Sequence, residues 1–427
     1  MVRRLIPTFI HSVGQAMDRQ LLTDYFLHGV AATTAAQCLP PHLPRTPPSG
    51  RTIVLGCGKA AAGMAEVAVR HLAGPVSGCV VTRHGHGVAG TIAGVDVIEA
   101  RHPVPDGDSV EAARRIIALA SQAGPDDRVI FLISGGGSAL LCAPAEGITL
   151  AEKQAMTDHL VRSGAAIGEI NLVRRHLSRI KGGRLAALAG ARGAELLTCC
   201  ISDVPDDEAA LIASGPSITA PFEPEAAIAI LEATGWPVSE AVADAIRANR
   251  PAQTAPHPVR MVATNGDALD AIARQAAADG WTLVDAGRAL AGDAAEIGRA
   301  HAMLAMEHAG KAGRFLLLSG GELTVRHASK DGCGGPNLEY LGGLLSAIDP
   351  GAPVAALACD SDGIDGTEDN AGGYAEAGWA RHPGLSEALA SHRTYGWFAG
   401  LGALVMTGPT RTNVNDIRMI AVEGRGI

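Results

Sequence analysis

The sequence is poor in aromatic residues and in lysine. Phe, Trp and Tyr make up 3% of the 427 residues, so few rings are available for stacking on nucleic-acid bases. The formal net charge of −9 also argues against a nucleic-acid partner. Arginine supplies most of the positive charge, and a lysine in a glycine-rich turn is therefore a candidate functional residue. Lys59 is such a lysine.

Long apolar runs and paired cysteines are also missing. No stretch approaches the ~20 apolar residues that a membrane span requires, and the first residues lack the apolar core of a secretory signal. We therefore expect a cytoplasmic protein that does not bind membranes. None of the eight cysteines forms a Cys-x-x-Cys pair, which argues against a structural zinc site. Scattered cysteines of this kind are typical of small core residues in a reducing compartment.

What the chain does contain is a repeated alternation of short apolar runs and helical segments. Its length suits two domains, and a proline-rich stretch at Pro251–Pro258 indicates a boundary. We predict an α/β protein with two domains, 1–250 and 259–427. Each is expected to be a mostly parallel sheet flanked by helices, with the active site in the cleft between them.

One apolar run ends in a glycine-rich loop. The run 127–133 predicts a buried strand, and Ala139 could begin a helix. Between them lie Ser134, Gly135, Gly136, Gly137 and Ser138. A loop of this kind can present backbone N–H groups to an anion such as phosphate, although it could also be a tight turn without a ligand.

Known nucleotide fingerprints are absent. No Walker-type loop occurs, and the turn Gly56-Cys-Gly-Lys59 is followed by its next glycine only at Gly63, which is the wrong spacing for a dinucleotide-binding loop. A second strand, Arg314–Leu318, is expected to end in a loop that repeats the Ser-Gly-Gly pattern. That loop contributes Ser319, Gly320, Gly321 and Glu322.

A basic segment follows the first glycine loop. We predict a helix over Glu169–Leu188 in which Asn171, Arg174 and Arg175 share one face, with Lys181 further along. These residues could clamp an anion opposite the glycine loop, or they could form a solvated basic face.

Carboxylates gather after two further strands. Asp203 follows a strand that ends near Ile201, and Asp360, Asp362 and Asp365 follow another. Such groups could hold Mg²⁺ or accept a proton from a hydroxyl, although turn and capping roles are alternatives. The histidines of Thr82-Arg-His-Gly-His-Gly87 and His102 do not predict a metal site, because no carboxylate lies at ligand spacing.

Taken together, these loops resemble the glycerate 2-kinase family, the two-domain type whose C-terminal half is a MOFRL domain. Some members carry the name hydroxypyruvate reductase, including those of tartrate degradation. Eight segments appear in family order across nearly the whole chain, at 56–60, 134–140, 171–185, 202–216, 319–322, 334–337, 360–366 and 407–416.

The resemblance implies an ATP- and Mg²⁺-dependent kinase that converts D-glycerate into 2-phosphoglycerate, with Lys59 as a catalytic residue. The chain departs from the family at Pro336, where many members have an arginine that is proposed for the active site. Proline has neither charge nor N–H, so that role is either absent here or passes to another cation such as Arg326 or Arg411.

We therefore predict a catalytic set of Lys59, Asp203 and Asp362, and a metal-binding set of Asp203, Asp360 and Asp365. The predicted residues for substrate and phosphate are Ser134, Gly135, Gly136, Gly137, Ser138, Asn171, Arg174, Arg175, Lys181, Ser319, Gly320, Gly321, Glu322, Asn337, Thr407, Gly408, Thr410 and Asn413.

Two other functions are compatible with the sequence. An NAD(P)H-dependent hydroxypyruvate reductase would need a dinucleotide site, which the spacing at Gly56 does not support. A regulator that binds small anions would bind glycerate or a nucleotide without turnover. Assembly into a homodimer is left open.

Overall fold

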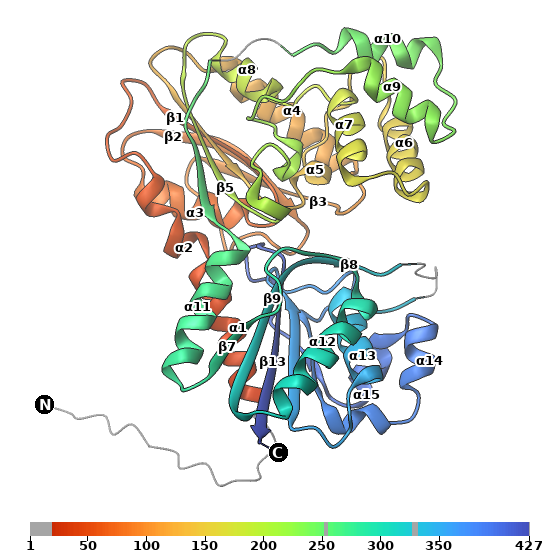
Figure 1. Cartoon of the computed structure of the whole chain (residues 1–427). Helices are drawn as coiled ribbons and strands as arrows, with labels where there is room; N and C mark the ends of the chain where they lie inside the picture. Colours follow the sequence, from red (N-terminus) through yellow and green to blue (C-terminus); the bar gives the residue numbers. More distant parts are fainter. Residues whose placement is uncertain (1–18, 252–254, 327–331, 427) are drawn as a thin grey trace, which may run out of the picture.

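The computed structural model describes residues 19–251, 255–326 and 332–426. It consists of two α/β halves, one above the other in Figure 1, and each half is built on its own sheet with helices on both faces. This confirms the predicted fold class. No helix in the described residues combines the length and apolar character needed to cross a bilayer.

The first sheet has six strands in the order β3-β2-β1-β4-β5-β6, and all of its pairs are parallel. Its two central strands, β1 and β4, are buried along their whole length, as the apolar runs predicted. The strands are β1 (Thr52–Cys57), β2 (Val76–Arg83), β3 (Val95–Ala100), β4 (Arg128–Ile133), β5 (Glu195–Ile201) and β6 (Val259–Ala263).

Helices cover both faces of this sheet, and four more helices form a separate packed cluster beside it (Figure 1). The helices are α2 (Ala35–Cys38), α3 (Ala61–His71), α4 (Gly107–Gln122), α5 (Gly137–Leu140), α6 (Leu150–Arg162), α7 (Ile167–His176), α8 (Arg184–Gly190), α9 (Pro224–Ala233) and α10 (Glu240–Ala248). Short 3₁₀ segments are η1 (Pro40–His42), η2 (Pro205–Asp207) and η3 (Ile212–Ser214).

The predicted helix Glu169–Leu188 is two helices, α7 and α8. The helix α7 ends at His176, and Gly182 and Gly183, both with positive φ, lie in the turn that precedes α8. Lys181 therefore lies in a turn and not on a helix face.

The second sheet has the order β12-β11-β10-β13-β9-β7, with β8 also pairing with β9. Our prediction of a mostly parallel sheet was wrong here, because only β7 and β8 run parallel to β9 and the other pairs are antiparallel. The link between β10 and β11 is too short for a crossover helix, so the chain turns back antiparallel. The strands are β7 (Thr282–Asp285), β8 (Leu290–Asp293), β9 (Ala312–Thr324), β10 (Val354–Asp360), β11 (Gly372–Glu376), β12 (Leu404–Val405) and β13 (Asp416–Arg425).

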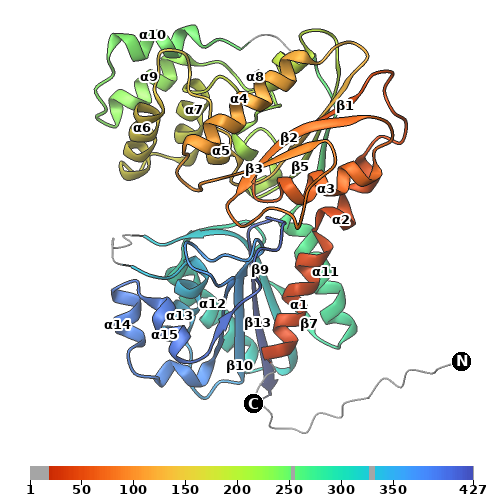
Figure 2. The same cartoon turned by 180° about the vertical axis from the view of Figure 1, so that it is seen from behind.

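The helices of the second half lie on opposite faces of this sheet. The helix α1 packs beside α11 on one face, which Figure 2 shows from behind, and α12 and α13 cover the other face. The helices are α1 (Arg19–Ala32), α11 (Asn265–Ala278), α12 (Ala294–Ala309), α13 (Pro336–Ala347), α14 (Leu385–Ala390) and α15 (Thr394–Gly400), with a 3₁₀ segment η4 (Ala377–Arg381).

Two features place the division between the halves differently from the predicted 1–250 and 259–427. The strand β6 pairs with β5 in the first sheet, and α1, near the start of the chain, packs on the second half. We therefore propose that the first domain runs from α2 to the end of β6, and that the second comprises α1 and everything after Ala263.

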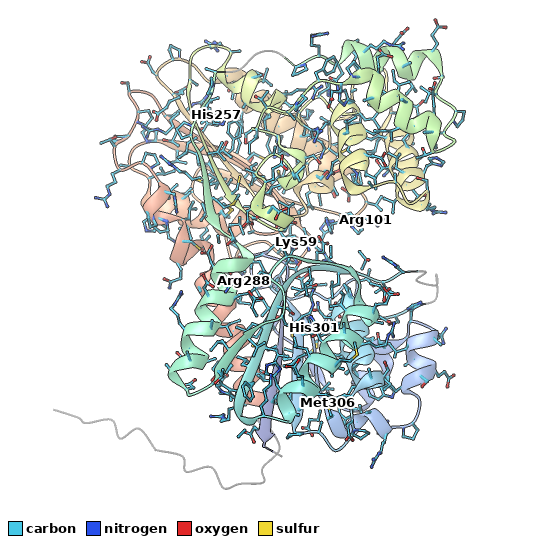
Figure 3. All side chains as sticks on the ribbon, viewed as in Figure 1. Lys59, Arg101, His257, Arg288, His301 and Met306 are labelled. Carbon is cyan, nitrogen blue, oxygen red and sulfur yellow. The ribbon has the colours of Figure 1, made fainter. Side chains whose placement is uncertain are left out.

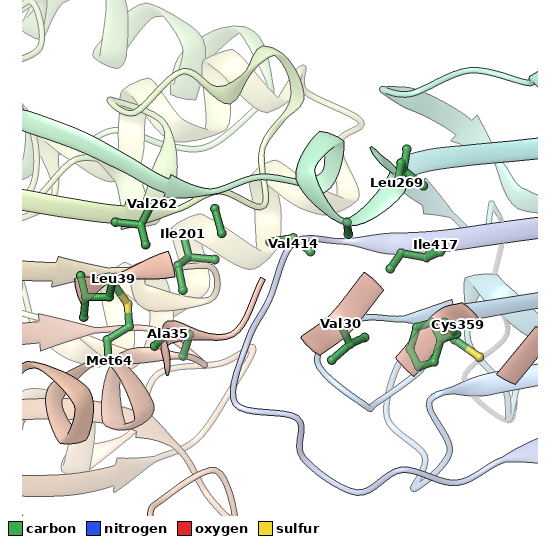
Figure 4. Close-up of a cluster of buried hydrophobic side chains, with 14 of the residues drawn as sticks. Val30, Ala35, Leu39, Met64, Ile201, Val262, Leu269, Cys359, Val414 and Ile417 are labelled. Atoms are coloured by element: carbon green, nitrogen blue, oxygen red, sulfur yellow. The ribbon is translucent and has the colours of Figure 1, made fainter. Parts of the chain in front are cut away.

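One apolar core runs through both halves. Figure 4 shows Met64 and Ile201 of the first half in the same buried cluster as Val30, Leu269 and Ile417 of the second. Because burial of apolar surface is the main favourable term in folding, this shared core fixes the two sheets relative to one another. The side chains that meet between the two sheets are therefore held on a common packed base.

Candidate active site

The glycine turns after β1 and β4 are fastened to each other. The two strands are neighbours in parallel register, so both turns leave the same edge of the sheet. The N–H of Ser134 donates to the carbonyl of Cys57 at 3.0 Å, and the N–H of Lys59 donates to the carbonyl of Gly135 at 2.9 Å. The hydroxyl of Ser134 accepts from the N–H of Ala60 at 3.0 Å. Ser134 is thus a structural link that sets the position of Lys59.

The glycines of these turns allow close approach of the neighbouring groups. A Cβ on Gly58 would collide with Ser134, and a Cβ on Gly135 would collide with the side chains of Asp203 and Asn413. Asn413 donates to the carboxylate of Asp203 at 3.3 Å and belongs to the loop before β13. The first glycine loop therefore lies directly against groups from both halves.

Lys59 reaches from the first half of the protein to the second. Figure 3 shows it where the two halves meet, and its ammonium forms an ion pair with the buried carboxylate of Asp362. Burial alone would lower the pKa of Lys59, but the carboxylates of Asp362, Asp360 and Asp203 together raise it above its ordinary value. Burial would likewise raise the pKa of Asp362, and Lys59 instead holds it below the usual range.

The carboxylates around Lys59 outnumber it. Burial raises the pKa of Asp203 to about 6, and burial together with Asp362 raises the pKa of Asp360 well above its ordinary value. Glu322 is exposed, yet burial by the surrounding protein and the carboxylates of Asp203 and Asp416 raise its pKa to about 7. The site thus carries excess negative charge, which a bound cation would relieve.

The loop that carries Asp362 is held by the polar segment before β13. The N–H of Thr410 donates to the carbonyl of Asp362 at 3.1 Å, and its hydroxyl donates to the carbonyl of Ser361 at 2.5 Å. Asp362 also accepts the N–H of Ile364 at 2.8 Å. Thr410 therefore holds the loop that carries Asp362, which explains one of the polar residues of the 407–416 segment.

Asp365 differs from the other two aspartates of its loop. Its two oxygens accept the N–H groups of Asn337 and Leu338 at 3.0 and 3.1 Å, so it caps the start of α13. The side-chain amide of Asn337 donates to Asp365 at 3.2 Å and to Asp416 at 2.7 Å, and so links the two carboxylates. Pro336 occupies the first position of α13, where its fixed φ and missing N–H are favourable. We therefore leave Asp365 out of the proposed metal-binding set, and Asn337 serves the same cap.

The predicted loop Ser319–Glu322 is instead part of β9. Gly320 and Gly321 pair with β13, and the N–H of Gly320 donates to the carbonyl of Gly287 at 2.9 Å. Both of their carbonyls accept from the buried guanidinium of Arg418, at 3.1 and 2.9 Å. The sheet and Arg418 use these backbone groups, and within the segment only the side chain of Glu322 is exposed.

Two of the predicted cations lie at the other end of the first glycine loop. Lys181 is buried and donates to the carbonyl and hydroxyl of Ser138 at 2.8 and 2.6 Å. Ser138 also pairs with the hydroxyl of Ser214 at 3.0 Å. Arg174 lies near Lys181, and burial lowers its pKa.

The remaining predicted residues have other neighbours as well. Arg175 is close to Glu223 and Glu208, and Thr407 lines a surface pocket beside α1 with Arg19 and other residues. Asn171 lies on α7, and Gly408 lies against the loop at Gly363. Of the two cations suggested in place of an arginine at Pro336, Arg326 approaches Glu296 at 3.9 Å, and Arg411 has a positive φ beside α3.

The structure adds two histidines that we had set aside. His102 lies against Gly136 and Lys59, and His86 is buried without a hydrogen-bond partner for either ring nitrogen. Burial lowers the pKa of His86 to about 4. Burial and the nearby cations Lys59 and Arg83 lower the pKa of His102 to about 3, so both rings are neutral. His84 approaches Asp106 and Asp108 outside the cleft, but Asp106 already caps α4. The residues that flank His86 and His102 in the chain gave no sequence signal for this placement.

The fold and the cleft define a two-domain α/β protein with a lysine and several carboxylates between its sheets, and comparisons with known proteins agree with that class. Residues 21–248 match a domain of unknown function, DUF4147, and residues 315–416 match the MOFRL family. The chain is 36% identical to "Glycerate 2-kinase" of Pyrococcus horikoshii, over 88% of each chain. It is 45% identical to a "Putative hydroxypyruvate reductase" of Agrobacterium vitis, over 87% of this chain and all of that one.

A solved structure is similar over almost the full length. The crystal structure of glycerate kinase from Thermotoga maritima aligns with a TM-score of 0.81 and 33% sequence identity, covering 94% of this chain and 99% of that one. The chain therefore belongs to the glycerate 2-kinase family, as its motifs had indicated.

Proposed function

We propose that the protein transfers the γ-phosphoryl group of ATP to the 2-hydroxyl of D-glycerate and forms 2-phosphoglycerate and ADP. The observation that carries this proposal is the meeting of Lys59 with Asp203, Asp360 and Asp362 directly against Gly135. Phosphoryl transfer needs cations around the moving group and a carboxylate near the attacking hydroxyl, and these residues supply both. The family's members and their printed names support the same reaction.

In this mechanism Lys59 binds phosphate oxygens and stabilises the charge that develops on them. Asp362 holds the ammonium of Lys59 in the cleft. Asp203, with its pKa raised to about 6, accepts the proton of the 2-hydroxyl while the oxygen forms its bond to phosphorus and the bond to the β-phosphate oxygen breaks. Asn413 and the glycine loop keep Asp203 in place.

The carboxylates fit Mg²⁺, which prefers oxygen ligands. Asp360 and Glu322 would hold it, since both have raised pKa values from burial and neighbouring carboxylates, and no ion pair is found for either among the described residues. When bound, Mg²⁺ neutralises phosphate charge and orients the nucleotide. Metabolite substrates of this kind also agree with the expected cytoplasmic location.

The rival function is reduction of hydroxypyruvate with NAD(P)H, which the name of the Agrobacterium vitis relatives suggests. A dinucleotide site needs an acidic residue at the end of the second strand to bind the ribose. The strand β2 ends in Arg83 instead, and the turn at Gly58 is closed by Ser134. These features favour the kinase.

One experiment separates the two functions. The purified protein is assayed with D-glycerate and MgATP, and in parallel with hydroxypyruvate and NADH or NADPH. The product of the first reaction is identified by phosphorus NMR, which distinguishes 2-phosphoglycerate from 3-phosphoglycerate. Oxidation of NADH or NADPH without phosphorylation would overturn the proposal.

A further inference from the structure

A buried group of cations lies at the end of the glycine loop away from Lys59. Lys153 of α6 is 4% exposed, and Lys181 is 1% exposed. Arg174 of α7 lies near both of them. Lys153 lies on α6, Lys181 in the turn before α8, and Arg174 on α7. Ser138 lies at one end of this group, where its carbonyl and hydroxyl accept hydrogen bonds from Lys181.

Lys153 has no counter-charge in the described parts of the chain. Its ammonium is buried without a hydrogen-bond partner, and the Cys142 thiol, a weak acceptor, lies near it. No described carboxylate forms an ion pair with Lys153, Lys181 or Arg174. Burial lowers the pKa of Lys153, and burial together with Lys153 lowers the pKa of Lys181 well below its ordinary value, so the charged forms of both lysines are disfavoured until an anion binds beside them.

The two ends of the glycine loop therefore differ in charge. At Gly135 a single lysine faces several carboxylates, an arrangement that suits phosphate with a metal ion. At Ser138 cations gather without described carboxylates, an arrangement that suits an anion bound without a metal. The two ends are three residues apart, and in a 2-hydroxy acid the carboxylate is attached to the carbon that carries the reacting hydroxyl.

We propose that Lys153, Lys181 and Arg174 form the subsite for the substrate's carboxylate, with Lys153 as a specificity-determining residue. This inference rests on the proposed function, because it takes the acceptor to be a small 2-hydroxy acid. Ser138 and Arg174 are partly open and contact the carboxylate, while the two buried lysines beneath supply the charge. Neutral analogues of the acid would gain nothing from this subsite.

The test compares Lys153→Met with Lys311→Met in the full chain. Lys311 is exposed and pairs with Glu307 at 2.8 Å, so it serves as a matched control. Thermal unfolding is measured without ligand, and binding of D-glycerate and of its neutral amide is measured by calorimetry. Lys153→Met is expected to unfold at a higher temperature than the wild type, because a buried amine without a hydrogen-bond partner is replaced by an apolar side chain.

The same variant is expected to bind D-glycerate at least about 10-fold more weakly, because a charge-assisted contact to the carboxylate is lost. It should bind the neutral amide and ADP with the affinity of the wild type. In kinetics the KM for glycerate should rise with kcat within a few-fold. Lys311→Met should change none of these values. A merely structural lysine would give the opposite stability result, a lower unfolding temperature with unchanged affinity.

Unchanged glycerate affinity in Lys153→Met, or weaker ADP binding with normal glycerate binding, would overturn the subsite. The proposed kinase function has its own test, which is independent of the subsite: it is wrong if the wild-type protein does not phosphorylate glycerate. In that case hydroxypyruvate replaces glycerate in the calorimetry, and loss of its binding in Lys153→Met would still support a carboxylate subsite.

Discussion

Lys59, two residues beyond the end of β1, forms an ion pair with Asp362, two residues beyond the end of β10. The pair joins the parallel sheet of the first half to the mixed sheet of the second. Lys59 is mostly buried and Asp362 fully so, which means that water screens the interaction little. The proposed catalytic groups thus depend on how the two halves are packed, and the shared apolar core provides that packing.

Replacing Lys59 by methionine should lower kcat by about 10²–10³-fold, since a charged donor at the transferring phosphoryl group is lost. The variant should also be less stable by about 3–5 kcal/mol, because the buried carboxylate of Asp362 loses its partner. Steady-state kinetics and urea unfolding measure the two effects.

The double variant Lys59→Met/Asp362→Asn separates these effects. Removing both charges should restore most of the stability without restoring turnover. Near-normal kcat in Lys59→Met, with product identified by phosphorus NMR, would remove Lys59 from the mechanism.

The pH dependence of kcat/KM should report Asp203. Its pKa is raised to about 6, and only the ionised carboxylate can accept the hydroxyl proton. Activity should therefore be present above pH 6 and fall about tenfold per unit as the pH drops below it. Asp203→Asn should be at least about 10²-fold slower and lack this acid limb. An acid limb retained in that variant would assign the titration to another group.

Much of this site was predictable because its chemistry depends on residue types in short loops. The lysine in a glycine turn, the glycine loop after β4 and the aspartates after β5 and β10 were each visible as strand ends followed by polar or flexible residues. Carboxyl ends of parallel strands meet at one edge, so their convergence in the first half followed from the pattern.

What the sequence did not reveal depends on tertiary contacts. Asp362 and Asp365 have similar neighbours in the chain, yet one pairs with Lys59 and the other caps α13. Lys153 resembles any lysine on an amphipathic helix until the fold buries it. The antiparallel pairs of the second sheet and the packing of α1 on that half arise from long-range pairing, for which local patterns carry no signal.

Substituting Gly135 by alanine should impair catalysis through steric overlap alone. A Cβ there would collide with Asp203 and Asn413, and Gly135 has no positive φ that would strain alanine. We expect kcat to fall at least about tenfold as Asp203 is displaced, with stability lowered by about 1–3 kcal/mol. Gly396→Ala is the control, since its Cβ would meet nothing within 4 Å inside α15 and should stabilise the helix by about 0.5–1 kcal/mol. A Gly135→Ala enzyme with normal kcat would show that Asp203 need not lie against this loop.

Replacing Asp365 by asparagine tests whether this residue caps α13 or binds a metal. An amide has one acceptor oxygen, so it cannot accept from the N–H groups of both Asn337 and Leu338, and its NH₂ would face one of these donors. The free energy of unfolding, measured in urea, should fall by about 1–3 kcal/mol. The exposed Asp126→Asn serves as the control and should leave stability within about 0.5 kcal/mol. The Mg²⁺ concentration that gives half-maximal activity should be unchanged in Asp365→Asn. If that concentration rises at least about tenfold while stability stays at the wild-type value, Asp365 is a metal ligand and its contact with α13 is secondary.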